Sequence, residues 1–420
     1  MKHVFYNIFA LGISVSLLSS GCGDDTDSSV TGSATTTSSS STSGGGGGAG
    51  GGVEAPSLEQ VLGELDADRD GTLSKYAAGD SGWPLALEGG HLFVTTNLYQ
   101  SLVAGDHDGW SGTALTEGNG FRWALIEVPA GDHYKFVAGS DYQADPWSRS
   151  FDYDDNGQIS LVAPSAAHLE RFFGVSDAAM EPRTLQIWVP EGDVTHVLYV
   201  HDGQNLFDPA ATAGGWKLQK DAPPGMMFVG INNTPARMDE YTHVVDQIYG
   251  DMLGGKGDAY ANYIQGTIRP IVAAHYGEPP KVGVMGSSLG GLISLHIADH
   301  LPGEYDFAAS LSGTLGWGSI GLMNETIIER YVAYGERQAT VLYVDSGGGG
   351  ACSDDDEDGI EDDGPGDDNY CETVQFQGAL KDIGYVEGTH LHSWWEPDAM
   401  HNEAAWAARV YRPLTIFSSL

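Results

Sequence analysis

Ser288 is the residue whose surroundings most clearly indicate chemistry. It is the centre of Gly286-Ser287-Ser288-Leu289-Gly290, which follows a short apolar run and leads into an apolar helical pattern. This arrangement is typical of a nucleophile elbow, the strained turn that presents a serine between a strand and a helix. A side chain at 286 or 290 is expected to collide with the neighbouring strand or helix. Leu289, at the helix start, would offer its backbone N–H to a developing oxyanion.

A serine nucleophile needs a base and a group that orients the base. In hydrolases built around such an elbow the chain order is serine, acid, histidine. His401 is the predicted base, because it follows the last predicted strand on a loop at a helix start. The other histidines after Ser288 lie in the helix leaving the elbow or in the last strand: His296, His300, His390 and His392.

The segment that positions these residues alternates apolar strands with helical stretches from residue 181 onward. Such alternation predicts a parallel sheet covered on both faces, here in an α/β-hydrolase layout. Helices are expected over 260–276 and 289–299. The predicted strands cover 184–189, 196–200, 226–231, 282–285, 307–311, 341–344 and 390–395.

The 420-residue chain is long enough for two domains, and its 19 basic and 58 acidic side chains give a formal net charge of −39. That charge argues against a nucleic-acid partner. Residues 1–22 predict an export signal of lipoprotein type, with Cys22 as the residue that would carry the lipid. Simple secretion is the alternative, and membrane contact is expected only through the lipid anchor. The Ser/Thr/Gly-rich stretch 23–56 predicts a flexible linker.

Residues 57–88 predict a short acidic helical segment. The alternating aspartates Asp66, Asp68 and Asp70, followed by Gly71, resemble the first half of an EF-hand calcium loop. The twelfth position is Ala77, where the bidentate glutamate is expected. An acidic turn after a helix is therefore the alternative.

Residues 89–165 change to short alternating β segments separated by glycine turns. The stretches 105–110 and 129–137, followed by Asp145-Pro146, resemble a glycogen- and starch-binding type of carbohydrate-binding module, an immunoglobulin-like β-sandwich. Trp110, Tyr142 and Trp147 are candidates for stacking on a sugar ring. For Trp110, packing in the sandwich core is the favoured alternative.

Four motifs over residues 181–420 together resemble the putative-esterase family, which holds feruloyl and acetyl xylan esterases, esterase D and enterochelin esterases. They are 197–207, 237–242, 286–291 and 401–406. The resemblance implies that Ser288 is the nucleophile and His401 the base. It also implies an oxyanion hole formed by the backbone N–H groups of Leu289 and Gln204. Arg237, Glu240 and Tyr241 would shape or brace the pocket, with an Arg237–Glu240 ion pair as the alternative.

The acid has three candidates. The strand 341–344 ends in Asp345 and a glycine run, where hydrolases usually place the acid a few residues past the strand end. An acidic insertion follows, and Asp367 and Asp368 then precede a predicted helix over 372–380, the context that follows the acid in relatives. Asp368 is the chosen acid, with Asp345 and Asp367 as the alternatives. Asp345 would otherwise hold the glycine loop by hydrogen bonds to backbone N–H groups.

The insertion 352–371 has the oxygen-ligand spacing of a calcium loop. The predicted ligands are Asp354, Asp356, Asp358 and Asp362, with Asp363 as an alternative to Asp362, and a solvated acidic loop is the alternative to calcium. If Cys22 carries a lipid, Cys352 and Cys371 are left to form a disulfide in an oxidising compartment. Calcium here would be structural, and no cofactor is expected for catalysis.

The leading functional hypothesis is an exported serine carboxylic ester hydrolase acting on feruloyl or acetyl esters of polysaccharide. The first alternative is an enterochelin-type siderophore esterase. The second is a surface carbohydrate-binding lipoprotein with an inactive hydrolase domain. The expected partners are the ester substrate and carbohydrate.

Overall fold

The computed structural model describes residues 56–79, 82–362 and 368–420. The predicted signal with Cys22, nearly all of the predicted linker, and the candidates Asp363 and Asp367 lie outside these residues. Within the described residues, every helix is too short or too polar to cross a bilayer.

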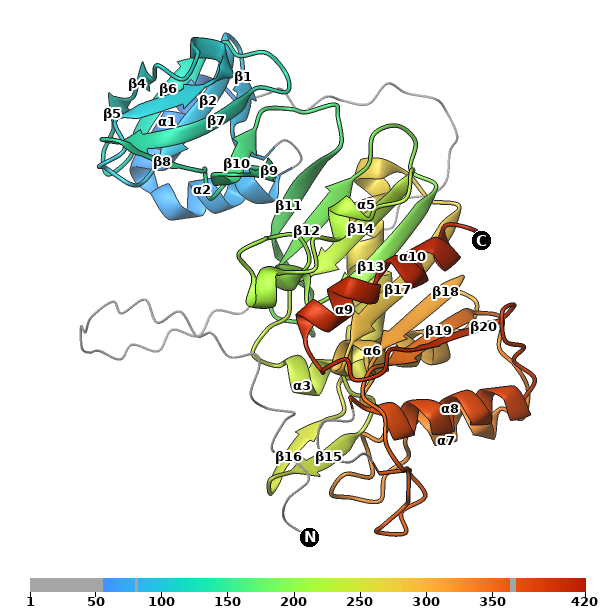
Figure 1. Ribbon diagram of the computed structural model, residues 1–420. Helices are drawn as coiled ribbons and strands as arrows, with labels where there is room; N and C mark the ends of the chain where they lie inside the picture. The colour runs from blue at the N-terminus through green and yellow to red at the C-terminus, as the bar shows by residue number, and fades with distance from the viewer. Residues whose placement is uncertain (1–55, 80–81, 363–367) are drawn as a thin grey trace, which may run out of the picture.

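A mixed sheet of fourteen strands runs through both parts of the molecule (Figure 1). Its α/β portion has the order β11-β12-β14-β13-β17-β18-β19-β20, in which β13 to β20 pair in parallel and β12 is antiparallel to both neighbours. Each strand predicted from residue 181 onward is present, with ends within two residues of the prediction. The bounds are β11 His168–Val175, β12 Arg183–Val189, β13 His196–His201, β14 Met226–Ile231, β17 Lys281–Ser287, β18 Phe307–Leu311, β19 Val341–Ser346 and β20 Leu391–Trp395.

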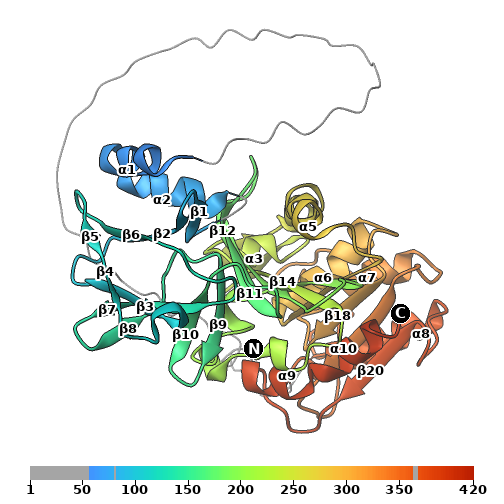
Figure 2. The ribbon, with the colours of Figure 1, turned by 90° about the horizontal axis from the view of Figure 1, so that it is seen from above.

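Helices cover both faces of this sheet, as Figure 2 shows for α5 and α6 on one side and α9 and α10 on the other. The alternation of side chains along a strand explains the two layers. Val197 and Tyr199 of β13 join one core cluster, and Leu198 and Val200 join the other. The first layer contains α4 Gly257–Tyr263, α5 Arg269–Tyr276, α6 Leu289–His300, α7 Ile327–Ala333 and α8 Tyr370–Asp382; the second contains α9 Glu403–Arg409 and α10 Tyr411–Phe417. A π-helical segment, Ile264–Ile268, lies between α4 and α5, so the helix predicted over 260–276 is not a regular α-helix.

The N-terminal part packs a second sheet against the far end of the large one. A four-stranded sheet has the order β1-β2-β6-β5, with bounds Leu85–Leu87, Gly90–Thr95, Arg122–Ile126 and Thr116–Glu117. Phe93 of β2 and Phe136 of β7 share a core cluster between the two sheets. The facing strands are β3 Leu102–Gly105, β4 Thr113–Ala114, β7 His133–Ala138, β8 Asp141–Gln143, β9 Ser150–Asp154 and β10 Gly157–Leu161. Two packed sheets agree with the predicted sandwich, whereas its immunoglobulin-like character stays a prediction.

The predicted boundary between residues 165 and 181 falls on strand β11. This strand pairs with β9 of the N-terminal part and with β12 of the α/β part. The two parts are therefore joined by backbone hydrogen bonds within one sheet rather than by a linker.

The prediction of a partial EF-hand loop over 66–77 is wrong. Helix α1, Leu58–Ala67, is followed at once by helix α2, Arg69–Ala78. Asp68 caps α2 by accepting a hydrogen bond from the Gly71 N–H at 3.1 Å, and Asp70 pairs with Arg69 at 2.8 Å. Aspartate is a strong N-cap residue, so the same aspartates that resemble calcium ligands start a helix here. Both helices pack on the outer face of the four-stranded sheet through a shared apolar cluster.

Candidate active site

Ser288 occupies a strained turn between β17 and α6. Its backbone has φ 57° and ψ −126°, a conformation that non-glycine residues rarely adopt. Gly286 is required, because a Cβ there would lie 2.6 Å from the Gly290 carbonyl carbon. The expectation for Gly290 is wrong, since a Cβ on that residue would meet its nearest neighbours at 3.4 Å or more. The close approach of Gly286 to the backbone of Gly290 is what makes the turn sharp.

Three side chains from different parts of the chain meet at this turn. His401 Nε2 lies 2.9 Å from Ser288 Oγ, and His401 Nδ1 lies 2.7 Å from Asp368 Oδ1. Ser288 ends the turn after β17, Asp368 precedes α8, and His401 lies between β20 and α9. Because the carboxyl ends of parallel strands meet at one edge of a sheet, residues far apart in sequence converge there. The structure thus brings together the serine, the histidine and the aspartate that the sequence nominated.

The second carboxylate oxygen of Asp368, which does not face His401, is held by hydrogen bonds from buried groups. It accepts hydrogen bonds from the Gly347 N–H at 2.6 Å and from the Ser312 hydroxyl at 2.7 Å. Arg409 Nη2 lies 3.5 Å from the same oxygen and donates to Ser312 Oγ at 2.6 Å. Asp368 is buried, so these donors replace the water that the carboxylate has lost. They fix the carboxylate with its other oxygen directed at His401.

Asp345, an alternative acid, is not at the histidine. Its carboxylate accepts from Arg409 Nε at 3.0 Å and from the Tyr343 hydroxyl at 2.8 Å, and the Ser312 N–H lies 3.3 Å away. Burial raises the pKa of Asp345, although Arg409 works in the opposite direction. Asp345 therefore contributes to the buried support beneath Asp368. Its suggested role in holding the glycine loop is replaced by this pairing with Arg409.

Ser312 and Arg409 were not identified from the sequence. Ser312 follows β18, the neighbour of the elbow strand, so its place at the carboxyl edge of the sheet was an available signal. Arg409 is only 2% exposed although it lies in an otherwise apolar helix turn. A buried arginine must be paired, which was the signal there.

The loop after β13 lies against the start of α6. A Cβ on Gly290 would be 3.5 Å from Asp202 Oδ2, which places this loop next to the elbow. Asp202 has the left-handed φ of 58° and is followed by a 3-10 turn, Gly203–Asn205, that contains Gln204. Leu289 begins α6, and the first N–H groups of a helix have no partner within the helix. Both predicted oxyanion donors are therefore on segments that border Ser288.

A network of polar side chains holds this loop. Arg237 pairs with both oxygens of Asp202 at 2.8 Å, and Asn233 Nδ2 donates to Asp202 at 2.6 Å. The Asp202 N–H donates to the Tyr241 hydroxyl at 3.2 Å. Burial acts to raise the pKa of Asp202, but Arg237 and Asn233 outweigh it and hold that pKa below its usual value. Arg237 and Tyr241 thus brace the loop that carries Gln204.

The alternative of an Arg237–Glu240 ion pair is wrong. Glu240 is buried and pairs with Arg183 through two hydrogen bonds of 2.9 and 2.8 Å. Arg237 and Glu240 are three residues apart on helix α3, which spans Arg237–Glu240, and this spacing allows a local ion pair. Each residue instead forms a bidentate pair with a distant partner, which is Asp202 after β13 for Arg237 and Arg183 on β12 for Glu240.

The acidic insertion gathers three of its four predicted ligands. Oxygens of Asp354, Asp356 and Asp362 lie within 4.8 Å of one another. Asp358 is outside this group, and its carboxylate accepts a hydrogen bond from the Ile360 N–H at 2.8 Å. The prediction of Asp358 as a ligand is therefore not supported. Burial and then the neighbouring carboxylates raise the pKa of Asp356.

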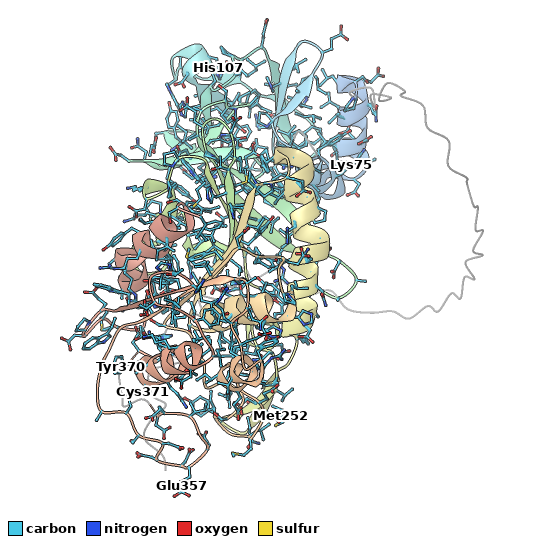
Figure 3. All side chains as sticks on the ribbon, turned by 90° about the vertical axis from the view of Figure 1, so that its right-hand side faces the viewer. Lys75, His107, Met252, Glu357, Tyr370 and Cys371 are labelled. Carbon is cyan, nitrogen blue, oxygen red and sulfur yellow. A yellow bond between two sulfur atoms is a disulfide. The ribbon has the colours of Figure 1, made fainter. Side chains whose placement is uncertain are left out.

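The predicted Cys352–Cys371 disulfide is present, with the Cα atoms 5.4 Å apart. Cys371 lies in the first turn of α8, three residues after Asp368. Figure 3 shows Tyr370 and Cys371 at the near end of the insertion and Glu357 at its far end. The disulfide thus fixes the base of the acidic loop close to the segment that delivers Asp368. Disulfides of this kind are typical of exported proteins.

The predicted sugar-stacking aromatics have different surroundings. Trp110 is half-buried and its ring centroid lies 6.2 Å from that of Tyr142, whose exposed fraction is 45%. Neither residue belongs to the core clusters of the described chain, so core packing does not account for Trp110. Trp147 packs against the cluster beneath α1 and α2 and against Phe173.

Comparison with known families decides the class of protein. Residues 176–407, more than half of the chain, match the model of the family described as "Putative esterase". The chain belongs to this esterase family. It is accordingly a carboxylic ester hydrolase of the α/β type, and the match covers the α/β part of the fold.

More distant similarities accompany the family match. The chain is 30% identical over 123 residues to the uncharacterized protein YbbA of Bacillus subtilis, an alignment that spans 28% of the chain and about half (49%) of that relative. Among solved structures it is similar to the enterobactin esterase FES of Shigella flexneri, with 13% identity, coverage of 78% and 93% of the two chains and a TM-score of 0.45. It is also similar to an IroE-like serine hydrolase of Shewanella oneidensis, with 18% identity, coverage of 60% and 80% and a TM-score of 0.46.

Proposed function

We propose that this esterase works by a Ser288–His401–Asp368 triad. The supporting observation is the chain of two hydrogen bonds, 2.9 Å from Ser288 to His401 and 2.7 Å from His401 to Asp368. With its Nδ1–H donated to Asp368, His401 presents the Nε2 lone pair to the serine hydroxyl. His401 takes the serine proton as Ser288 Oγ attacks the ester carbonyl, and then returns it to the leaving alcohol. Water, activated by His401 in the same way, hydrolyses the acyl-enzyme.

The oxyanion of each tetrahedral intermediate is assigned to the backbone N–H groups of Leu289 and Gln204. A donor of this kind is worth about 10²- to 10³-fold in turnover. The helix dipole of α6 adds to the field at Leu289, because α6 begins at that residue. The Asp202–Arg237 pair keeps the Gln204 turn in place.

The proposed substrates are acyl esters of polysaccharide, such as acetyl or feruloyl groups on xylan. The neighbouring rings of half-buried Trp110 and exposed Tyr142 on the N-terminal β part support this choice, since aromatic faces stack on sugar rings. We further propose that the protein is exported and acts outside the cytoplasm, in agreement with the disulfide.

The triad is tested by Ser288→Ala with p-nitrophenyl acetate as substrate. The variant should lose at least about 10⁴-fold in kcat/KM, with an unchanged circular dichroism spectrum. Ser287→Ala is the matched control, because Ser287 is the neighbouring serine of the same turn and should retain activity. Full activity of Ser288→Ala would refute the assignment.

Substrate class is tested by comparing acetyl xylan, feruloyl oligosaccharide and a ferric catecholate siderophore ester. Preference for the xylan or feruloyl esters supports the proposal, and Trp110→Ala should then raise KM on polymeric xylan but leave p-nitrophenyl acetate cleavage unchanged. Hydrolysis of the siderophore ester alone would overturn the substrate while leaving the triad intact.

A further inference from the structure

A second group of polar side chains lies on the far end of helix α6. His296 and His300 are four residues apart and therefore occupy the same helix face. Asp258, from α4, reaches both: its Oδ1 lies 2.9 Å from His296 Nε2 and 3.3 Å from His300 Nδ1. All three ligand atoms lie within 4.8 Å of one another, and the two imidazole rings stack with centroids 5.5 Å apart.

His296 is a buried histidine in which only one ring nitrogen has a hydrogen-bond partner among the described residues. Its side chain is fully buried, and its Nδ1 has no hydrogen-bond partner among the described residues. Its Nε2 is hydrogen-bonded to Asp258. Because Nε2 is the nitrogen that faces Asp258, an ion held by the three residues would take Nε2 as its ligand atom, and Nδ1 would keep no partner among the described residues.

These distances fit a transition-metal ion. Zinc binds imidazole nitrogen at about 2.0–2.1 Å and carboxylate oxygen at about 2.0–2.2 Å, so neighbouring ligands of a tetrahedral site are about 3.3–3.5 Å apart. The 3.3 Å contact of Asp258 with His300 already matches, and the 2.9 Å contact with His296 must open by a few tenths of an ångström. The Asp258 side chain is 62% exposed, which leaves space for a water as the fourth ligand.

We propose that Asp258, His296 and His300 form a binding site for a divalent transition-metal ion, with zinc as the best match. Two imidazoles and one carboxylate favour zinc over calcium or magnesium, which prefer oxygen ligands. His243 stacks on His296, but its Nε2–H donates to the Glu325 carbonyl and it lies outside the group of three close ligand atoms.

The ion would clamp α4 to the helix that carries the elbow. His296 follows Ser288 by eight residues, a distance of about 12 Å along a helix. The ion is therefore too far from Ser288 to take part in ester hydrolysis, and its effect should be on stability. Binding to the folded state alone raises the unfolding temperature in a concentration-dependent way.

The test is zinc binding to the full chain after removal of metals with a chelator and dialysis. Zinc is titrated against a chromophoric chelator, with millimolar calcium present to occupy oxygen-rich sites such as the acidic insertion. Wild type should bind one zinc at this site and unfold at a higher temperature with zinc than without. His300→Ala and Asp258→Asn should each weaken that binding at least about tenfold and abolish the zinc-dependent shift.

Both substitutions are at partly exposed side chains, so the fold should tolerate them. His392→Ala, a half-buried histidine on β20, is the matched control and should bind zinc as wild type does. Ester cleavage without added metal should be the same in wild type and Asp258→Asn. Zinc binding that is unchanged in His300→Ala and Asp258→Asn, or no binding at micromolar zinc, would overturn the proposal and leave a hydrogen-bonded cluster only.

Discussion

Exchanging Asp368 or Asp345 for asparagine distinguishes the roles of two carboxylates that both contact Arg409. Asp368 contacts His401 at 2.7 Å, whereas Asp345 contacts Arg409 at 3.0 Å and Tyr343 at 2.8 Å. We expect Asp368→Asn to impair turnover and Asp345→Asn to impair stability. Both substitutions exchange one carboxylate oxygen for an amide nitrogen, so each variant is the control for the other.

The expected sizes follow from these contacts. An asparagine at 368 would hold His401 in the wrong tautomer, which in a serine hydrolase triad costs about 10⁴-fold in kcat. An asparagine at 345 leaves the buried Arg409 without its closest charge, and breaking a buried ion pair costs about 3–5 kcal/mol. At about 2–4 °C per kcal/mol for a domain of this size, the unfolding temperature should fall by roughly 6–20 °C.

The assay is kcat and KM on p-nitrophenyl acetate well below the unfolding temperature, together with calorimetric unfolding of each variant. Asp345→Asn should keep kcat within about tenfold of wild type, because its carboxylate does not touch His401. A 10⁴-fold loss in Asp345→Asn with little loss in Asp368→Asn would show that the acid has been assigned to the wrong residue.

Three further predictions concern stability. Burial lowers the pKa of His201 to about 3, whereas a histidine in the unfolded chain has a pKa near 6.5. The stability that His201 contributes above pH 6.5 is therefore lost as the pH falls from 6.5 toward 3. Urea unfolding should therefore show a drop between pH 7 and pH 5 that is about 2 kcal/mol larger in wild type than in His201→Gln; equal drops would contradict the buried neutral ring. Cys352→Ser should cost about 3 kcal/mol in calorimetric unfolding and reduce kcat, because Cys371 follows Asp368 by three residues; a variant with wild-type kcat would show that the bridge does not position Asp368. Calcium should raise the unfolding temperature of wild type but not of Asp356→Asn, and an equal shift in both would place calcium elsewhere.

Much of the α/β part was readable from local patterns. The seven strands have apolar runs bounded by turns, and a buried parallel strand requires just such a run on both faces. The elbow at Ser288 depends on Gly286, two residues before it, where a Cβ would meet the Gly290 backbone. His401 could be chosen because, among the histidines after Ser288, it alone follows the last strand on a loop, whereas the others lie in α6 or in and next to the last strand.

Local patterns failed where one residue type serves two purposes. Aspartates at alternate positions suggest calcium ligands, yet Asp68 caps a helix and Asp358 accepts from a nearby backbone N–H. The pair Arg237 and Glu240 has ideal helical spacing, yet each binds a partner more than thirty residues away. Long-range contacts override local preference because they are buried and bidentate.

The sequence by itself determined the elbow, the strands of the α/β part and the histidine that follows them. Only the tertiary structure decided between Asp345 and Asp368. Asp345 lies at the end of β19 and Asp368 follows that strand, and the sequence favoured Asp368 only through the predicted helix that comes after it. Arg409 neutralises Asp345 in the interior, while the Gly347 N–H and the Ser312 hydroxyl turn Asp368 toward His401. These partners come from separate strands and helices, so the choice between the two carboxylates exists only once the chain has folded.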